Sequence, residues 1–363
     1  MSAAKTFVYV SNAQDGTIDA YSMDTGSGAL ASIGKVDAAK LVMPMTVSPN
    51  KKYLYAVIRS QPHRVLSYTI DPATGALAQK ASAPLPDSMP YVSTDRAGRF
   101  LLTASYGGDK LAVSPIGENG LVEAEAIQVI PTGRNAHSIL PDRSNNFVYA
   151  ATLGANQVLQ FKFDGKTGKL SANDPPAVSA EAGHGPRHMV FSPDGKYLYV
   201  LNELSGHVAQ YAVDSGKGTL TIVGTISSVP AEAGLVWGVA QAPAGSAAAA
   251  AAPKDDKPKI WAADIQITPD GKFLYTTERT TSKIALFTVA PGSGKLAYVS
   301  NFATEAQPRG IRIDPTGRYL VASGEKSDRL SVYKIDQATG KLGEPNRFPV
   351  GNGANWVEIV DVQ

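Results

Sequence analysis

Arg187, His188 and Glu203 are the residues whose types and spacing first suggest chemistry in this sequence. The two basic residues stand just before an apolar segment, and the carboxylate stands just after the next one, within GPRHMVFSPDGKYLYVLNE at 185–203. The Pro-Asp-Gly inside this stretch predicts a tight turn followed by an alternating strand. Arginine suits phosphate and carboxylate groups, and histidine and glutamate can carry protons. The stretch therefore indicates a place where anion binding and acid–base chemistry could meet.

This stretch is one copy of a repeat that runs along the chain. Each copy is a turn followed by a strand that opens on an aromatic residue, and these aromatics are Phe7, Tyr53, Phe100, Phe147, Tyr197, Phe273 and Tyr319. All-β units that recur at roughly 45–50 residues are typical of propellers with four strands per blade. The repeat therefore predicts an all-β, seven-bladed β-propeller with four antiparallel strands in each blade.

The two ends of the chain complement each other. The first copy, KTFVYVSN, lacks the strand that precedes it elsewhere, and the last segment, GANWVEIVDV, supplies such a strand with no partner after it. We expect this C-terminal strand to join the N-terminal blade and close the ring of a single domain, 1–363. One long gap between copies contains low-complexity Ala/Pro/Lys sequence at 241–259, which we interpret as a surface loop rather than a functional lid.

In a propeller, the start of each innermost strand and the end of each second strand lie at the same mouth of the central channel. A purely structural mouth would more often carry Ser, Thr, Gly and Asn, whereas this one is rich in charge, which predicts a site for a small anionic molecule. The second strands end on Asn12, Arg59, Tyr106, Glu203, Arg279, Glu325 and Lys326, and the innermost strands start on His137, Arg187, His188, Asp264, Arg309 and Asn355.

Several of these residues also have structural interpretations. Arg187 could pair with Glu203 in an ion pair, and His188 could be a satisfied core histidine. No metal site is expected, because we count only Asp264 and Glu203 as carboxylates that converge at this mouth.

Composition excludes several functional classes. The formal net charge is +2 and no basic block is present, which gives no case for nucleic acid or a membrane as partner. The sequence has no cysteine, so disulfides and thiolate sites are excluded. Because no apolar stretch reaches 18 residues and the N-terminus does not resemble a signal peptide, we expect a cytoplasmic protein. We also expect a monomer or weak dimer.

Segments longer than the repeat carry a family resemblance. GPRHMVFSPDGKYLYVLNEL, WAADIQITPDGKFLYTTERT, QPRGIRIDPTGRYLVASGEKS and RFPVGNGANWV resemble the seven-bladed lactonase propellers of cycloisomerase type, a family that includes bacterial 6-phosphogluconolactonases. The resemblance runs from end to end apart from the Ala-rich segment. It implies a catalytic set of one histidine, two arginines and one glutamate, which falls on His137, Arg187, Glu203 and Arg279.

The resemblance also implies a reaction, the hydrolysis of 6-phospho-D-glucono-1,5-lactone to 6-phosphogluconate in the pentose phosphate pathway, without a cofactor. Either Glu203 or His137 would activate water, and Arg187, with His188, would stabilise the tetrahedral oxyanion. The candidates for the phosphate are Arg59, Arg279 and Arg309, and those for other substrate contacts are Tyr106, Asp264 and Lys326.

Two alternatives stay open. A cycloisomerase that acts on a carboxylated muconate would use the same rim for its carboxylates. A non-catalytic binding platform would instead show exposed aromatic residues on that face and no convergent histidine and glutamate.

Overall fold

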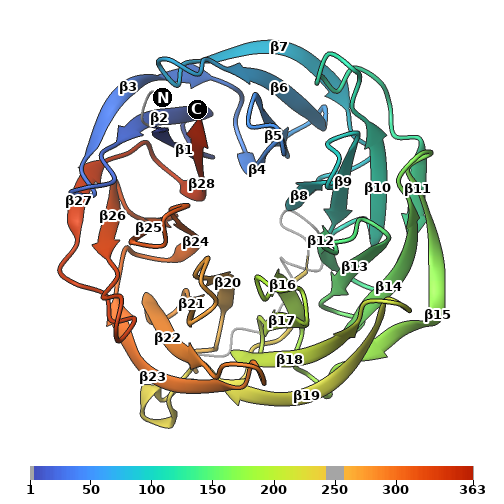
Figure 1. Ribbon diagram of the computed structural model, residues 1–363, viewed down its shortest axis with the longest axis vertical. Coiled ribbons are helices and arrows are strands. Elements are labelled where there is room, and N and C mark those ends of the chain that lie inside the picture. The colour runs from blue at the N-terminus through green and yellow to red at the C-terminus, as the bar shows by residue number, and fades with distance from the viewer. Residues whose placement is uncertain (1–3, 243–256, 363) are drawn as a thin grey trace.

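The seven aromatic strands of the repeat are the second strands of seven four-stranded antiparallel sheets, which surround a central channel (Figure 1). The computed structural model describes residues 4–242 and 257–362. It confirms the predicted all-β, seven-bladed β-propeller with four antiparallel strands per blade.

The strands follow the order of the chain, from the channel outwards in each blade, except in the first. Blade 1 comprises β28 (Ala354–Val362), β1 (Lys5–Asn12), β2 (Thr17–Met23) and β3 (Leu30–Asp37). Blade 2 comprises β4 (Val42–Val47), β5 (Tyr53–Ile58), β6 (Arg64–Ile70) and β7 (Leu77–Pro84). Blade 3 comprises β8 (Tyr91–Thr94), β9 (Phe100–Ser105), β10 (Lys110–Pro115) and β11 (Gln128–Pro131).

Blade 4 comprises β12 (Ala136–Pro141), β13 (Phe147–Thr152), β14 (Gln157–Asp164) and β15 (Lys169–Ser179). Blade 5 comprises β16 (Pro186–Phe191), β17 (Tyr197–Asn202), β18 (His207–Asp214) and β19 (Thr219–Ser227), followed by a short 3₁₀ turn, η1 (Ala231–Ala233). Blade 6 comprises β20 (Ala262–Ile267), β21 (Phe273–Glu278), β22 (Lys283–Val289) and β23 (Leu296–Ala303). Blade 7 comprises β24 (Pro308–Ile313), β25 (Tyr319–Gly324), β26 (Arg329–Lys334) and β27 (Asn346–Pro349).

The ring closes through the two ends of the chain, as the sequence predicts. β28 pairs with β1 along its length, from Lys5 opposite Val362 to Asn12 opposite Ala354. In Figure 1 the red β28 lies beside the blue β1, and both termini lie there. The C-terminal strand therefore covers the inner edge of β1, which would otherwise be open to other strands.

The repeated aromatics hold neighbouring blades together. Phe7 of blade 1 lies over Gly75 in the outer turn of blade 2, and a Cβ at Gly75 would come within 2.3 Å of the ring. Tyr319 of blade 7 packs in the same way on Gly28 of blade 1, and its hydroxyl donates a hydrogen bond to the Gly26 carbonyl. Both glycines have a positive φ, which glycine adopts without strain. One contact, repeated around the ring, thus explains both the aromatic and the glycine of the motif.

The long gap between copies joins β19 to β20. Its flanks meet in a parallel bridge between Val236 and Lys259. Most of the predicted surface loop, residues 243–256, lies outside the described residues, so that interpretation stays a prediction. No helix in residues 4–242 and 257–362 has the length and hydropathy needed to cross a membrane.

Candidate active site

A β-bulge at the start of the innermost strand positions the principal residues of the site. In β12, Ala136 and Ser138 pair with Thr152 and Ala151, which leaves His137 as an extra residue without a partner. The same irregularity occurs at Arg187 in β16, Arg309 in β24 and Asn355 in β28. An extra residue bends its strand and changes the direction of its side chain, and bulges are frequent beside active sites. The bulges therefore gather residues of separate blades at one end of the channel, which we call the Glu203 mouth.

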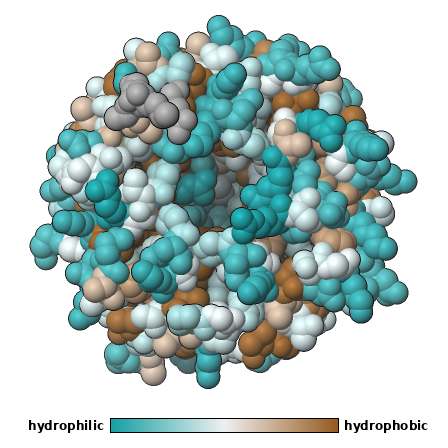
Figure 2. All heavy atoms as spheres, in the orientation of Figure 1, coloured by the Kyte–Doolittle hydropathy of each residue, from teal (hydrophilic) through white to brown (hydrophobic). Residues whose placement is uncertain are grey.

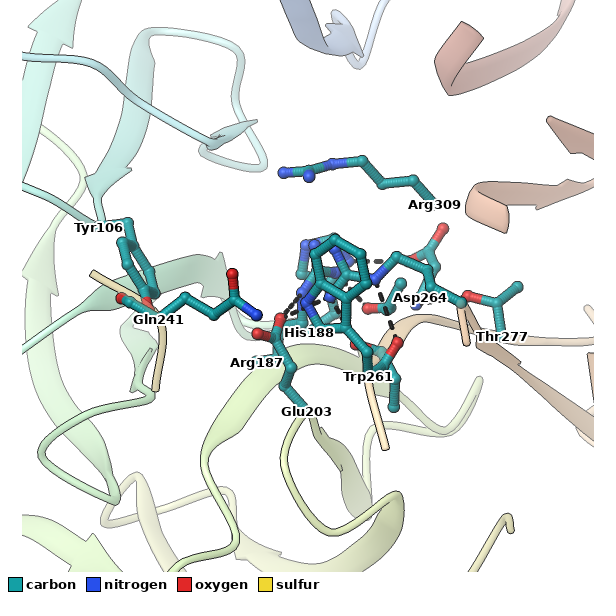
Figure 3. Close-up of polar contacts among 12 residues, drawn as sticks. Tyr106, Arg187, His188, Glu203, Gln241, Trp261, Asp264, Thr277 and Arg309 are labelled. Carbon is teal, nitrogen blue, oxygen red and sulfur yellow. Dashed lines mark hydrogen bonds and ion pairs between the residues drawn. The ribbon is translucent and has the colours of Figure 1, made fainter. Parts of the chain in front are cut away.

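Glu203 lies between two arginines, and Figure 3 shows it beside Arg187. Its Oε2 atom accepts a hydrogen bond from Arg187 Nε at 2.7 Å and another from Arg279 Nη2 at 2.8 Å. All three side chains are buried, and Arg187 is fully inaccessible to solvent. The structure thus joins three of the four residues implied as catalytic in one ion-paired cluster between blades 5 and 6.

Each arginine is fixed by further contacts but keeps donors for a ligand. Arg187 Nη1 donates to the Ala263 carbonyl, and Nη2 is buried without a hydrogen-bond partner. Arg279 donates to the carbonyls of Trp261 and Ala262, and its guanidinium carbon lies 3.8 Å from the centre of the Trp261 ring. Buried polar groups are almost always paired in folded proteins. The orphan Nη2 of Arg187 is therefore an unsatisfied donor inside the buried cluster.

His137, the fourth implied catalytic residue, lies in the same buried region. Its ring meets that of Tyr106 edge-on at 5.7 Å and that of His188 at 5.4 Å, and its Nδ1 has no hydrogen-bond partner. Burial, together with the charge of Arg187, holds the pKa of His137 well below its ordinary value. The imidazole is therefore neutral near pH 7 and can accept a proton.

His188 forms a separate pair with Asp264 deeper in the channel. His188 Nδ1 lies 2.9 Å from Asp264 Oδ1, and the amides of Ile265 and Ile311 donate to the same carboxylate. Burial and Arg187 lower the pKa of His188 to about 4, although Asp264 opposes the shift. The Asp264 carboxylate thus has three hydrogen-bond partners, while His188 Nε2 is buried without one.

The outer part of the mouth is formed by Arg309, Arg59 and Tyr106. Arg309 Nη1 lies 3.4 Å from Glu325 Oε1, and Arg59 Nε donates to Ser88 Oγ at 2.9 Å. The Tyr106 hydroxyl donates to the Gln241 carbonyl at 2.6 Å. In Figure 3, Arg309 lies across the open space from the Glu203 cluster, and the Gln241 side chain points toward Glu203. These residues surround the entrance to the buried cluster.

Lys326 does not join the others. It is exposed in the turn after β25, and its side chain makes no hydrogen bond or ion pair with the described residues. Its role as a substrate contact stays a prediction that no contact in the structure supports.

The electrostatic balance keeps Glu203 ionised. Burial alone would raise the pKa of its carboxyl, but Arg279 and Arg187 outweigh burial and hold that pKa below its ordinary value. Burial also lowers the pKa of Arg187 to about 9, with a further contribution from Arg279, so Arg187 stays protonated at pH 7. The described residues contain no group of three or more His, Asp or Glu side chains that could hold a metal ion.

Two residues of the mouth do not appear among the sequence candidates. Trp261 directly precedes β20, so the rule for strand starts would have included it, and its ring and carbonyl both hold Arg279. Gln241 stands at the edge of a segment interpreted as low-complexity sequence, where no pattern distinguishes it. Its position at the mouth is apparent only in three dimensions.

Comparison with known proteins supports the same architecture. Residues 7–359 match the family model described as "Lactonase, 7-bladed beta-propeller". A 6-phosphogluconolactonase of Serratia proteamaculans is 38% identical over 356 residues, which cover 98% of this chain and 99% of that protein. One of Pectobacterium carotovorum is 37% identical over 353 residues, which cover 97% and 98%.

A solved structure shows the same fold. The periplasmic gluconolactonase of Pseudomonas aeruginosa has a TM-score of 0.84 and 26% identity, with 99% of this chain and 100% of that chain covered. The family expected from the sequence motifs is thus confirmed over nearly the whole length. The chain belongs to the family of seven-bladed β-propeller lactonases.

Proposed function

We propose that the protein hydrolyses 6-phospho-D-glucono-1,5-lactone to 6-phosphogluconate at the Glu203 mouth. The observation that carries this proposal is the buried cluster in which one carboxylate holds two arginines, while Arg187 Nη2 and His137 Nδ1 have no partner. A small molecule with a carbonyl oxygen and an anionic tail would use these groups. The two relatives named above are 6-phosphogluconolactonases, and this chain matches each of them over nearly its full length.

Arg187 would stabilise the charge that develops on the lactone carbonyl. When water attacks the carbonyl carbon, the carbonyl oxygen becomes a tetrahedral oxyanion. A fixed donor in a buried site stabilises such an oxyanion more than bulk water does, because it needs no reorganisation. Arg187 Nη2 is held by the contacts of Nε and Nη1 on either side of the guanidinium, so it is oriented before substrate binds.

His137 is the preferred base. Glu203 Oε2 already accepts two hydrogen bonds, and its lowered pKa makes it a weak base, so its main role would be to orient Arg187 and Arg279. The neutral imidazole of His137 would take a proton from the attacking water. It would then give that proton to the ring oxygen as the C–O bond breaks, which yields the hydroxy acid, and the new carboxyl group then loses its proton to water. The negative charge of bound substrate would raise the pKa of His137 toward neutrality.

Arg309 and Arg59 would bind the phosphate. Burial lowers the pKa of Arg59 to about 10, and Arg309 contributes to this shift, which indicates that the two cations lie close enough to repel each other. A phosphate between them would relieve that repulsion. Arg279 is less suited to this role, because its Nε and Nη2 donors are already used.

The proposal extends to the setting of the enzyme. We place it in the pentose phosphate pathway and in the cytoplasm, as a monomer or weak dimer that needs no cofactor. The compartment can be tested by fractionation, since the structural relative from Pseudomonas aeruginosa is described as periplasmic.

Turnover of two lactones tests the proposal. The rate above spontaneous hydrolysis is measured for the phosphorylated lactone and for glucono-1,5-lactone. Because a charge-assisted hydrogen bond contributes about 1.5–3 kcal/mol, kcat/KM should be about 10–100-fold higher with the phosphate. Arg309→Ala should raise KM for the phosphorylated lactone and change little for the other, since phosphate contacts act on binding. Equal kcat/KM for the two lactones in the wild type would contradict the substrate assignment.

A further inference from the structure

The channel also has an opening at its opposite end, where the innermost strands finish. A cavity of about 420 Å³ lies there, lined by residues of β8, β12, β16, β20, β24 and β28 and of the turns after them. We call this end the Arg143 mouth. The colours run clockwise around the ring in Figure 1 and anticlockwise in Figure 3, so the two figures view the channel from opposite ends. Figure 3 is the view onto the Glu203 mouth. Figure 2 shows the Arg143 face, with a central hollow surrounded by hydrophilic side chains.

Three arginines line this cavity, and two of them have no carboxylate partner. Arg96 Nε and Nη2 donate to the carbonyls of Asp142 and Pro141 at 3.0 and 3.1 Å, and Arg143 Nη1 donates to the Pro193 carbonyl at 2.6 Å. Neither forms an ion pair with any described residue, and each keeps further N–H groups free. The third arginine, Arg312, pairs with Glu358.

The carbonyl contacts fix the arginines before any ligand binds. Arg96 extends from blade 3 to the turn of blade 4, and Arg143 extends from blade 4 to the turn of blade 5. Each guanidinium is therefore held by the neighbouring blade instead of moving freely in solvent. An arginine that is already oriented loses less entropy when it binds an oxyanion.

The remaining walls of the cavity are aromatic and polar. Tyr91 and Trp356 meet edge-on with ring centres 5.7 Å apart, and Gln266 also lines the cavity. The inner end is formed by His188 and Asp264, and His188 Nε2 there is buried without a hydrogen-bond partner. Asp264 contacts His188 and two backbone amides, and it forms no ion pair with Arg96 or Arg143. A cavity with cationic donors, an unpaired imidazole nitrogen and aromatic surface is suited to an organic anion.

We propose that the Arg143 mouth is a second ligand site, for a small organic molecule that carries a phosphate or carboxylate group beside an apolar or aromatic part. Arg96 and Arg143 bind the oxyanion, and Tyr91 and Trp356 contact the apolar part. The site is separate from the Glu203 mouth, because the His188–Asp264 pair stands between the two. The inference does not depend on the reaction proposed above.

Calorimetry with phenyl phosphate and benzoate tests this site. Wild-type protein should bind at least one of the two probes. Arg143→Ala should weaken that binding about 10–100-fold, the value of one charge-assisted contact. Gln266→Glu should also weaken it, because it places a negative charge on the cavity wall without removing a hydrogen bond present in the structure. If Arg143→Ala does not fold, the affinity of Gln266→Glu still tests the site. Arg329→Ala, on β26, the third strand of blade 7, is the matched arginine control and should retain the affinity.

The results separate this site from the Glu203 mouth. Tighter binding of phenyl phosphate identifies a phosphate ester as the ligand class, and tighter binding of benzoate identifies a carboxylate. The proposal is overturned if neither probe binds to the wild type. It is also overturned if Arg309→Ala abolishes the binding while Arg143→Ala and Gln266→Glu leave it unchanged, since the probe would then occupy the Glu203 mouth.

Discussion

The two mouths of the channel both carry three or more arginines, but they use them in opposite ways. At the Glu203 mouth, Arg187 and Arg279 are buried and share the oxygen of one carboxylate. At the Arg143 mouth, Arg96 and Arg143 are exposed and bind backbone carbonyls of the next blade. The first arrangement places charge where water is excluded, so each unpaired donor has a large effect on a reacting molecule. The second is suited to binding and less to chemistry.

The backbone explains the difference. Arg187 of the Glu203 mouth stands on a bulge within β16. Arg279 stands directly after β21, and Glu203 and two backbone carbonyls hold its guanidinium in a buried position. Arg96 and Arg143 stand in turns after the strands. Side chains on rigid elements are placed more precisely than those on loops, and catalysis depends on such precision. The number of arginines is therefore a weaker guide to catalysis than their burial and backbone support.

The largest expected effect comes from the imidazole at the Glu203 mouth. His137→Gln should lower kcat by about 10²–10⁴-fold, the range for loss of a general base, because glutamine cannot accept the proton. His184→Gln is the matched control, since His184 is also buried but contacts Ser205 and Glu181 away from the channel. Steady-state kinetics on folded protein checks both. Near-normal kcat in His137→Gln would transfer the role of base to Glu203.

The next effect separates the carboxylates of the two mouths. Glu203→Gln leaves two buried arginines without their counter-charge and should lower the free energy of unfolding by about 3–5 kcal/mol, together with kcat. Glu358→Gln removes the partner of the more exposed Arg312 and should lower stability less, with kcat nearly unchanged. Urea unfolding and kinetics on the same samples measure both quantities. A full loss of kcat in Glu358→Gln would show that the two mouths are not independent.

A smaller effect concerns the pair that stands between the mouths. Burial and Arg187 lower the pKa of His188 to about 4 in the folded protein, below the value of about 6.5 in the unfolded chain. Between these values the unfolded state binds a proton that the folded state does not. The free energy of unfolding should therefore fall as pH drops from about 7 to 4, with His188 contributing about 3 kcal/mol. His188→Gln should make this slope shallower, and an unchanged slope in urea titrations would contradict the assignment.

Much of the fold could be predicted because each copy of the repeat contains the residues that pair its strands and pack its blade against the next one. The aromatic and the glycine of each copy meet between blades, and the ends of the chain complement each other, so blade number and ring closure follow from the sequence. The convergence of Arg187, Glu203 and Arg279 follows from strand order alone. These features depend on periodicity, which a single sequence displays directly.

The remaining features depend on geometry that periodicity does not contain. Alternation indicates which face a residue occupies, but it does not reveal the extra residue of a bulge, so the direction of His137 and Arg309 could not be derived. The same limit applies to His188, which turns toward Asp264 and the second cavity. Lys326 follows the strand rule but lies in an exposed turn. Arg96 and Arg143 lie in turns that start on Asp and end on Gly98 or Asn145 with positive φ, which explains the local structure, so nothing in the pattern marks the arginines as ligand contacts.

A crystal structure with bound 6-phosphogluconate tests the central claim most directly, because it shows which mouth holds the product. We predict that the product occupies the Glu203 mouth, with its carboxylate within hydrogen-bond distance of Arg187 Nη2 and His137 and its phosphate against Arg309 and Arg59. Product bound only at the Arg143 mouth, with Arg187 Nη2 still unpaired, would contradict the account.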